Sequence, residues 1–201
     1  METAGIAAII LAAGKSSRFG SDKLLSEVAY NGIRQPLILH TLSPWLEVFE
    51  QIHLITPVNN QQLRETCRAV TDRLNIVKAD KAELGMGHSL AAGIHATQAS
   101  KGWLIGLADM PMLKPDILEK LVSQLQQGAA LSAPFYDGKR GHPVAFSSQY
   151  RDDLMQLTGD VGAKTILKVH EIQIQAVNVD TPSVLIDVDT QTDISLLQKA
   201  R

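Results

Sequence analysis

Residues 6–25 read Ile-Ala-Ala-Ile-Ile-Leu-Ala-Ala-Gly-Lys-Ser-Ser-Arg-Phe-Gly-Ser-Asp-Lys-Leu-Leu, and the rest of the chain is organised around this stretch. Its first half is a continuous apolar run bounded by Gly14, which predicts a strand buried on both faces. Its second half is small and basic, with the cations Arg18 and Lys23. Because residues 12–14 (Ala-Ala-Gly) let a ligand approach the backbone closely, the strand and its loop predict a cradle for an anion.

Two common phosphate-binding loops do not fit this stretch. Gly14-Lys15-Ser16 matches the end of a Walker A loop, but that loop needs a glycine at position 9, where the chain has Ile9. The dinucleotide-binding fingerprint needs a Gly-x-Gly pair, and Gly14 and Gly20 are too far apart for it. An ordinary strand-to-loop junction rich in alanine and glycine remains the alternative.

The bulk composition limits the class of protein. A chain of 201 residues fits a single domain over residues 1–201, or one domain with a small appendage. A net charge of -2 gives no general attraction for nucleic acid. Cys67 is the only cysteine, so no internal disulfide can form and we expect a cytoplasmic protein. No apolar run has the length needed to cross a membrane.

Strand and helix signals alternate along most of the chain. We expect strands near residues 6–13, 27–30, 51–56, 76–77, 103–107, 130–135, 143–146, 172–179 and 184–188. We expect helices near residues 37–42, 61–74, 89–98, 115–127, 152–157, 163–169 and 190–199, the first of them interrupted by Pro44. This order predicts an α/β fold with a largely parallel sheet covered on both faces.

Asp109 follows the apolar strand signal of residues 103–107, in Leu-Ala-Asp-Met-Pro. In parallel sheets, ligands bind beyond the carboxyl ends of the strands, so the Gly14, Gly85 and Asp109 segments should meet in one crevice. A carboxylate there is suited to hold Mg²⁺ beside phosphate oxygens. The alternative is that Asp109 caps a local turn before Pro111.

A second acidic group lies near the C-terminus, in Asp187-Val188-Asp189-Thr190. Alternation along an extended segment places Asp187 and Asp189 on the same side. Thr190 is also a candidate cap for the closing helix, with Asp193 in its first turn. That alternative explains Thr190 and Asp193 well and Asp187 less well.

The stretch Leu84-Gly85-Met86-Gly87-His88-Ser89-Leu90 is a glycine-rich loop that leads into a helix. Two glycines let the backbone pass close to a planar ligand, and Ser89 at the helix start offers a hydroxyl to a base. The alternative makes Ser89 an ordinary helix cap and Gly93 a packing residue.

Several of these segments resemble one family. Leu11-Ala12-Ala13-Gly14-x-Ser16-x-Arg18-Phe19-Gly20-x-x-Lys23 resembles the signature of nucleotidyltransferases that attach a nucleoside monophosphate to a phosphorylated acceptor. The Gly-Met-Gly-x-Ser-Leu pattern at residues 85–90 is similar to that of the molybdenum cofactor cytidylyltransferases in the MobA-like group. This resemblance implies a three-layer Rossmann-like sandwich with a mostly parallel mixed sheet, as in the nucleotide-diphospho-sugar transferases.

The resemblance also implies roles for individual residues. Arg18, Lys23 and Asp109 would be catalytic, and Asp109, Asp187 and Asp189 would hold Mg²⁺. The implied nucleotide-binding residues are Leu11, Ala12, Ala13, Gly14, Gly85, Met86, Gly87 and Ser89.

Two further segments, Arg140-Gly141-His142-Pro143-Val144 and residues 158–164 (Thr-Gly-Asp-Val-Gly-Ala-Lys), resemble the acceptor side of the family. The implied acceptor-binding residues are Gly141, His142, Pro143, Asp160 and Gly162. His142 has a plainer alternative as a partly buried structural histidine, and Asp160 has one as a helix cap. Lys164 is a candidate phosphate contact, with a solvated surface charge as its alternative.

These features together predict a Mg²⁺-dependent nucleotidyltransferase. The resemblance implies that it transfers CMP from CTP to the phosphate of molybdopterin, with release of pyrophosphate, and that a molybdoenzyme or its chaperone is a candidate partner. The alternatives are transfer to a sugar or polyol phosphate, and a chaperone that binds nucleotide or pterin without turnover. The histidines show no zinc spacing, and the chain lacks a Gly-x-Ser-x-Gly nucleophile elbow.

Overall fold

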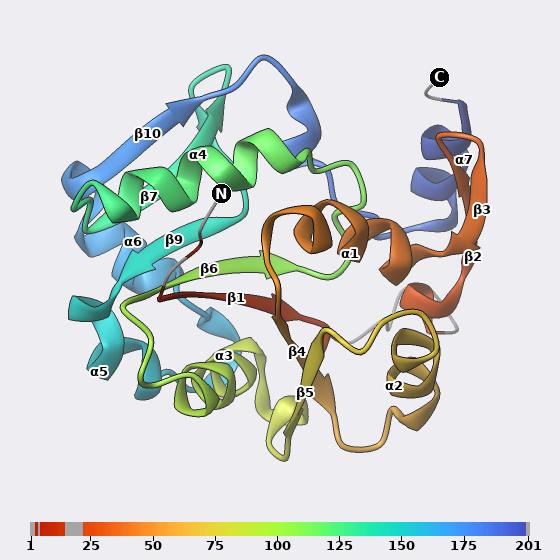
Figure 1. Ribbon diagram of the computed structural model, residues 1–201, viewed down its shortest axis with the longest axis horizontal. Helices are drawn as coiled ribbons and strands as arrows, with labels where there is room; N and C mark the ends of the chain where they lie inside the picture. The colour runs from red at the N-terminus through yellow and green to blue at the C-terminus, as the bar shows by residue number, and fades with distance from the viewer. Residues whose placement is uncertain (1–2, 4, 15–21, 200–201) are drawn as a thin grey trace.

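The computed structural model describes residues 3, 5–14 and 22–199 (Figure 1). Within these residues a mixed eight-stranded sheet has the order β10-β7-β9-β6-β1-β4-β5, with β8 paired to β7. Its strands are β1 (Ile6–Leu11), β4 (Ile52–Pro57), β5 (Leu74–Ala79), β6 (Gly102–Leu107), β7 (Leu131–Tyr136), β8 (Lys139–Arg140), β9 (Val144–Ser147) and β10 (Ile174–Asn178). The pairs β1–β4, β1–β6, β4–β5 and β7–β10 are parallel, whereas β9 is antiparallel to β6 and β7. The predicted α/β fold with a mostly parallel mixed sheet is confirmed.

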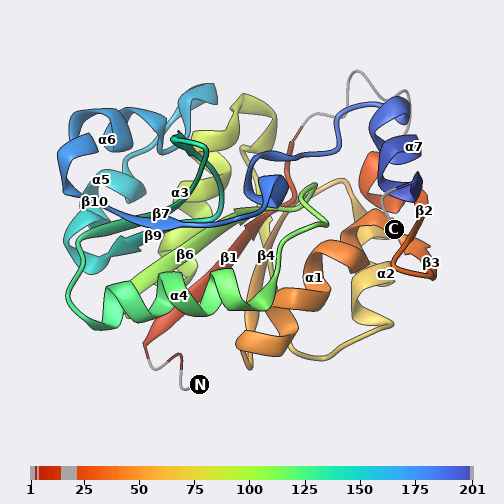
Figure 2. The same ribbon diagram turned by 90° about the horizontal axis from the view of Figure 1, so that it is seen from above.

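Helices cover both faces of this sheet. They are α1 (Leu37–Val48), α2 (Gln61–Arg68), α3 (Met86–Ala96), α4 (Pro115–Gln126), α5 (Arg151–Met155), α6 (Lys164–Val169) and α7 (Gln191–Lys199). Figure 2 shows α1 and α4 on one face and α3, α5 and α6 on the other. A separate hairpin of β2 (Glu27–Tyr30) and β3 (Ile33–Pro36) lies against α7, away from the main sheet.

The alternation of side chains along β1 accounts for two hydrophobic cores. Ala8 and Ile10 pack into the core shared with α1 and α4, and Ala7, Ile9 and Leu11 pack into the core shared with α3, α5 and α6. Ile9 and Ile10 are both fully buried. A strand with both faces covered has no place for polar residues, which explains the unbroken apolar run in the sequence.

The course of the chain creates a crevice beside β1. The chain runs from β1 outward through β4 to β5, and then returns to pair β6 with the opposite edge of β1. The carboxyl ends of β1 and β6 therefore lie at a reversal of strand order, where α/β sheets bind ligands. The segments that follow these two strands contain Gly14 and Asp109.

Two helices differ in extent from the sequence prediction. Helix α1 continues through Pro44, because packing of the fully buried Trp45 and its neighbours compensates for the missing backbone bond. Helix α2 ends at Arg68 instead of reaching Leu74. The apolar stripe stops there, since Val70 is exposed and Leu74 already begins β5.

Two other segments were also predicted wrongly. Helix α3 begins at Met86 and not at Ser89, because Gly85 adopts a φ of 124° and turns the chain into the helix earlier. Residues 184–188 form no strand in the sheet; Pro182–Leu185 is a short 3-10 turn. The apolar run of that segment reflects burial in the core, not strand pairing.

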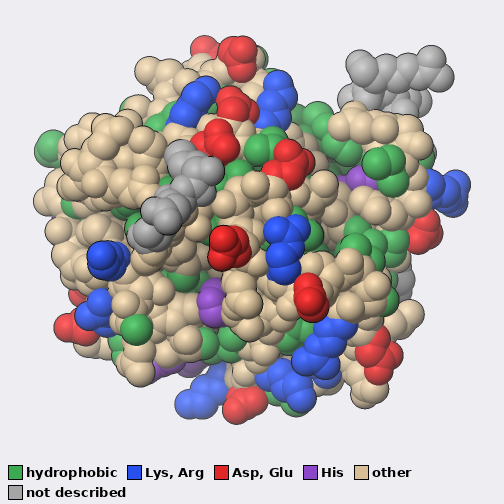
Figure 3. Space-filling model, viewed as in Figure 1, with side chains coloured by type: hydrophobic (Ala, Val, Ile, Leu, Met, Phe, Trp, Pro, Cys, Tyr) green, Lys and Arg blue, Asp and Glu red, His purple; other side chains and the backbone are tan. Residues whose placement is uncertain are grey.

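The surface agrees with the small net charge. On the face shown in Figure 3, acidic and basic side chains are interspersed. Among the described residues, no helix combines the length and the hydrophobicity needed to cross a membrane.

Candidate active site

A cavity of about 310 Å³ opens at the carboxyl ends of β1 and β6. The predicted site residues that line it are Leu11, Ala12, Ala13, Gly14, Lys23, Gly85, Met86, Ser89, Asp109, Asp160, Asp187 and Asp189. The structure thus brings together segments that are separated widely in the sequence. Four residues that the sequence does not indicate also line the cavity: Leu24, Ala82, Leu107 and Ala108. Their side chains are apolar and carry no reactive or charged group, so the sequence alone does not mark them as site residues.

Backbone hydrogen bonds fix the position of Asp109. The amide of Ala108 donates to the carbonyl of Leu11 at 3.1 Å, which extends the pairing of β6 with β1 by one bond. The buried hydroxyl of Thr41, on α1, donates to the carbonyl of Ala108 at 2.8 Å. The carbonyl of Asp109 itself accepts a bond from the amide of Val188 at 2.9 Å. Three hydrogen bonds therefore hold the backbone at residues 108 and 109.

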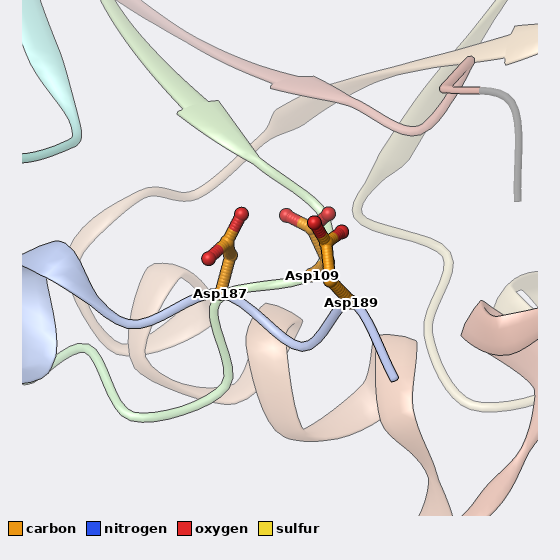
Figure 4. A group of neighbouring side chains, drawn as sticks. All are labelled: Asp109, Asp187 and Asp189. Carbon is orange, nitrogen blue, oxygen red and sulfur yellow. The ribbon is translucent and has the colours of Figure 1, made fainter. Parts of the chain in front are cut away.

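Three carboxylates gather at this point (Figure 4). Each of Asp109, Asp187 and Asp189 offers one oxygen, and these oxygens all lie within 4.8 Å of one another. Asp187 and Asp189 point to the same side of their segment, and the intervening Val188 is fully buried in the core. The Oδ1 atom of Asp109 is buried and accepts no hydrogen bond from the described residues. Closely spaced carboxylate oxygens with one unpartnered buried atom fit a hard divalent cation.

Lys23 brings a positive charge to this group. Its Nζ donates to Oδ2 of Asp109 at 2.8 Å and to Oδ1 of Asp189 at 3.0 Å. Burial alone lowers the pKa of Lys23, but the hydrogen bonds and charges of Asp109 and Asp189 together raise it above its ordinary value. Partial burial and the charges of Asp109 and Asp189 raise the pKa of Asp187, and a bond from its own backbone amide and the charge of Lys23 offset part of this rise.

A helix cap orders the end of the acidic segment. Asp193 Oδ2 accepts bonds from the amides of Asp189 at 2.9 Å and Thr190 at 2.6 Å, and the Thr190 hydroxyl accepts from the Asp193 amide at 3.3 Å. The slight burial of Asp193 opposes the change, but the Thr190 hydroxyl, which donates to Oδ2 at 2.9 Å, and next the two amides lower the pKa of Asp193. The capping role considered for Thr190 and Asp193 is thus present, and it leaves Asp187 and Asp189 facing the cavity.

The glycine-rich loop before α3 packs directly on residues 158–160. A Cβ atom added to Gly85 would lie 2.3 Å from the Gly159 carbonyl carbon, and one added to Gly87 would lie 2.6 Å from the Thr158 carbonyl oxygen. These glycines therefore allow two backbones to touch. Gly87 is used for this contact and does not line the cavity.

Ser89 lies within the first turn of α3 and does not cap it, since Gly85 occupies the cap position. Its side chain is buried, and its hydroxyl has no hydrogen-bond partner among the described residues. Met86, by contrast, is exposed and lies between this cavity and a second one. A buried, unpartnered hydroxyl in a cavity wall is available to a ligand.

The second cavity, of about 420 Å³, shares Leu11, Met86, Leu107 and Asp160 with the first. Its remaining lining residues are Leu90, Ile105, Arg140, His142, Val144, Phe146, Val161, Gly162, Ala163, Lys164 and Leu167. The lining is mostly apolar, with three basic side chains at Arg140, His142 and Lys164. Burial, and next the charge of Arg140, lower the pKa of His142, while Asp109 opposes them.

The remaining predicted residues lie elsewhere. Arg18 lies outside the described residues. Gly141 packs against the carbonyl of Val184, where an added Cβ would come within 2.3 Å, and Pro143 is buried; neither lines either of these two cavities. Asp160 does not cap α6, whose first turn has no side-chain cap.

The fold and the site define a class of protein: an α/β sandwich with a cluster of acidic side chains at the switch point of its sheet. Residues 8–176 match the family model of the MobA-like NTP transferase domain, and the chain belongs to this family.

Individual relatives cover most of the chain. It is 28% identical over 197 residues to the purine catabolism protein PucB of Bacillus subtilis, with 96% of this chain and 95% of PucB covered. It is 28% identical over 185 residues to the molybdenum cofactor cytidylyltransferase of Escherichia coli, with 92% and 91% covered. It is 29% identical over 201 residues to the molybdenum cofactor guanylyltransferase of Shewanella sediminis, with 97% and 96% covered.

A solved structure shares the fold. The crystal structure of Rv0371c from Mycobacterium tuberculosis superposes with a TM-score of 0.82 at 23% identity, covering 99% of this chain and 100% of that chain. The manganese complex of the same protein superposes with a TM-score of 0.73 at 22% identity, covering 98% and 100%. The chain is therefore a nucleotidyltransferase-family protein with the corresponding fold.

Proposed function

We propose that this protein transfers CMP from CTP to the phosphate of a molybdopterin-type acceptor and releases pyrophosphate. One observation carries the proposal: Asp109, Asp187, Asp189 and Lys23 meet in the same cavity as residues 11–14, which follow the central strand. A group of carboxylates beside a small, backbone-rich loop fits a nucleoside triphosphate and its divalent cation.

In the proposed reaction, an oxygen of the acceptor phosphate attacks the α-phosphorus of CTP. A new P–O bond forms, the bond to the β-phosphate oxygen breaks, and pyrophosphate leaves with the electron pair. Such chemistry depends on alignment and charge neutralisation and needs no protein nucleophile. The Ala12 amide is already bonded to the carbonyl of Ile55 at 2.8 Å, so the chain itself would supply the amides of Ala13 and Gly14, the ammonium group of Lys23 and, by resemblance, Arg18.

Asp109, Asp187 and Asp189 would hold Mg²⁺, whose bound charge would neutralise phosphate oxygens. The unpartnered Oδ1 of Asp109 and the spacing of the three carboxylates support this assignment. The manganese complex of the Mycobacterium tuberculosis neighbour is consistent with a divalent cation in this fold.

The lining of the second cavity favours a planar, partly apolar acceptor over a sugar phosphate. Leu90, Ile105, Val144 and Phe146 offer no hydrogen bonds to the hydroxyl groups of a sugar, and burying unpaired hydroxyls is costly. A pterin ring fits such a wall. Arg140 lines the same cavity and is a candidate partner for the acceptor's phosphate.

Choice of base is assigned to the loop at residues 85–89. The buried hydroxyl of Ser89 and nearby backbone groups would pair with the edge of a cytosine ring. Relatives of similar identity are named as a cytidylyltransferase and as a guanylyltransferase. The proposed preference for cytosine therefore depends on this loop and not on the relatives.

The experiment is an acceptor screen with CTP and Mg²⁺ that measures pyrophosphate release and product mass. We expect product with molybdopterin and none with sugar or polyol phosphates, and chelation of Mg²⁺ should stop release. Product only with a sugar phosphate would move the protein to that alternative. Tight nucleotide binding without release for any acceptor would support the non-catalytic alternative.

A further inference from the structure

The turn that carries Lys23 is tied to a neighbouring helix by one side-chain contact. Lys23 begins a 3-10 turn, Lys23–Leu25, and Asp22 caps that turn by accepting a bond from the Leu24 amide at 3.1 Å on Oδ1. The other oxygen of Asp22, Oδ2, accepts a bond from Nδ2 of Asn60. Asn60 is in turn the cap of α2, where its Oδ1 accepts from the Leu63 amide at 3.1 Å. Asn60 thus joins the start of α2 to the turn of Lys23.

Helix α2, which Asn60 caps, is anchored in the core. Leu63 and Cys67 anchor α2 in the core, and both are fully buried. Arg64 adds two hydrogen bonds to the turn before the helix, to the carbonyls of Pro57 at 2.7 Å and Val58 at 3.0 Å. Because α2 is anchored in this way, its cap Asn60 offers Asp22 a hydrogen-bond donor at a defined position.

The ammonium group of Lys23 needs this kind of support. Its side chain is long, with several rotatable bonds, and only 11% of it is exposed where it meets the two carboxylates. A shift in the turn would move Nζ away from Asp109 and Asp189, because the side chain has no other described hydrogen-bond partner. No local pattern in the sequence links Asn60 to Lys23.

We propose that Asn60 is a positioning residue for nucleotidyl transfer: through Asp22 it sets the turn that holds Lys23 between Asp109 and Asp189. This inference rests on the proposed function for its kinetic consequence, but the contact it describes can be tested without activity. The competing view is that Asn60 serves only as the cap of α2.

Asn60→Asp separates these two views. An aspartate keeps an oxygen for the Leu63 amide and remains a good helix cap, but it places a carboxylate against Asp22 and removes the donor. Combining it with Asp22→Asn exchanges donor and acceptor: the new amide at position 22 can donate to the new carboxylate and still accept from the Leu24 amide. The double variant also keeps the net charge of the native pair. Asn59→Asp, at the exposed neighbouring position, adds the same charge as the single variant and serves as its control.

Two readouts are compared across these proteins. The first is kcat/KM for CTP, with kcat and KM resolved; we expect a loss of tenfold or more for Asn60→Asp, recovery to within threefold of wild type in the double variant, and no change for Asn59→Asp. The second is the rate of acetylation of the Lys23 amine, followed by mass spectrometry relative to the exposed Lys120. We expect Lys23 to be protected in the wild type and the double variant and to react at least threefold faster in Asn60→Asp, with little change in Tm.

The inference is overturned if Asn60→Asp matches the wild type in Lys23 acetylation, or if the folded double variant fails to restore protection. If Asn60→Asp does not fold, the double variant decides: it must fold and protect Lys23 as the wild type does. If the wild-type protein shows no turnover with any acceptor, the proposed function fails, while the acetylation readout still tests the contact between Asn60 and Asp22.

Discussion

The amide of Val188 donates a hydrogen bond to the carbonyl of Asp109 at 2.9 Å, and this bond joins the C-terminal segment to the end of β6. Because Val188 is fully buried, its neighbours Asp187 and Asp189 turn outward beside the Asp109 carboxylate. One backbone contact between distant parts of the chain therefore assembles the acidic group.

Replacing Asp109 with asparagine should remove most or all of the turnover and leave the fold intact. The change removes one charged oxygen from the acidic group, and loss of such an electrostatic contact costs about 3 kcal/mol or more, which corresponds to roughly a 100-fold fall in kcat. The backbone bonds that hold residue 109 do not involve its side chain. Pyrophosphate release and the thermal midpoint are measured together, with Asp116→Asn on the surface of α4 as the control. Near-normal activity at ordinary Mg²⁺ would remove Asp109 from the mechanism.

Lys23→Ala should weaken nucleotide binding and slow the chemical step together. A lysine beside a triphosphate acts as a point charge in both the ground state and the transition state. We expect KM for CTP to rise and kcat to fall, and Lys120→Ala, an exposed lysine on α4, to change neither. The assignment of Lys23 to the phosphate cradle is wrong if both nucleotide affinity and turnover keep their wild-type values.

Thr41→Val should reduce stability and activity, whereas Thr41→Ser should nearly preserve both. The valine fills the same space but leaves the buried Ala108 carbonyl without its side-chain donor, at a cost of about 1–3 kcal/mol, and it loosens the backbone next to Asp109. The serine keeps the hydroxyl group. Denaturant unfolding and steady-state rates measure the two effects. Equal values for the valine and serine variants would show that the hydrogen bond has no part in placing Asp109.

The free energy of unfolding should fall as the pH drops below about 6.5, the unperturbed histidine value. Burial lowers the pKa of His53 and is the main factor that lowers the pKa of His142, so the unfolded chain binds protons at a higher pH than the folded protein does. Above this range both states carry neutral histidines. Below it, protons favour the unfolded state by at most ~1.4 kcal/mol per pH unit for each histidine, until the folded pKa is passed.

Urea unfolding of wild type and of a His53→Gln/His142→Gln double variant between pH 7.5 and 5.5 checks this expectation. The double variant should have the flatter profile, and His95→Gln, at an exposed position, should follow the wild type. A wild-type profile that is flat or rises toward acid pH would contradict it.

The sequence predicts the buried strands well because burial on both faces leaves a plain signal. The apolar runs of β1 and β6 show this, and they also place Gly14 and Asp109 at the edge of the sheet where the cavity opens. The same signal fails at residues 184–188, where apolar side chains are buried without pairing into the sheet.

Contacts between distant segments could not be predicted. The bond between Asn60 and Asp22 and the bond between Thr41 and Ala108 join residues with no shared local pattern. Gly85 and Gly87 do suggest a close approach, but the sequence gives no indication that the approaching group is the backbone of residues 158–159. These contacts arise from tertiary packing, which local spacing does not encode.

The most direct test of the proposed function is the ratio of kcat/KM for CTP to that for GTP, measured by steady-state turnover with molybdopterin and Mg²⁺. A wall made of Gly85, Met86 and the buried Ser89 is expected to fit a single ring and to pair with the cytosine edge. A site whose buried polar groups are left unpaired by the wrong base discriminates strongly. We therefore predict a large preference for CTP over GTP; a value for GTP equal to or above that for CTP, or no pyrophosphate release from either nucleotide, would contradict the proposed function.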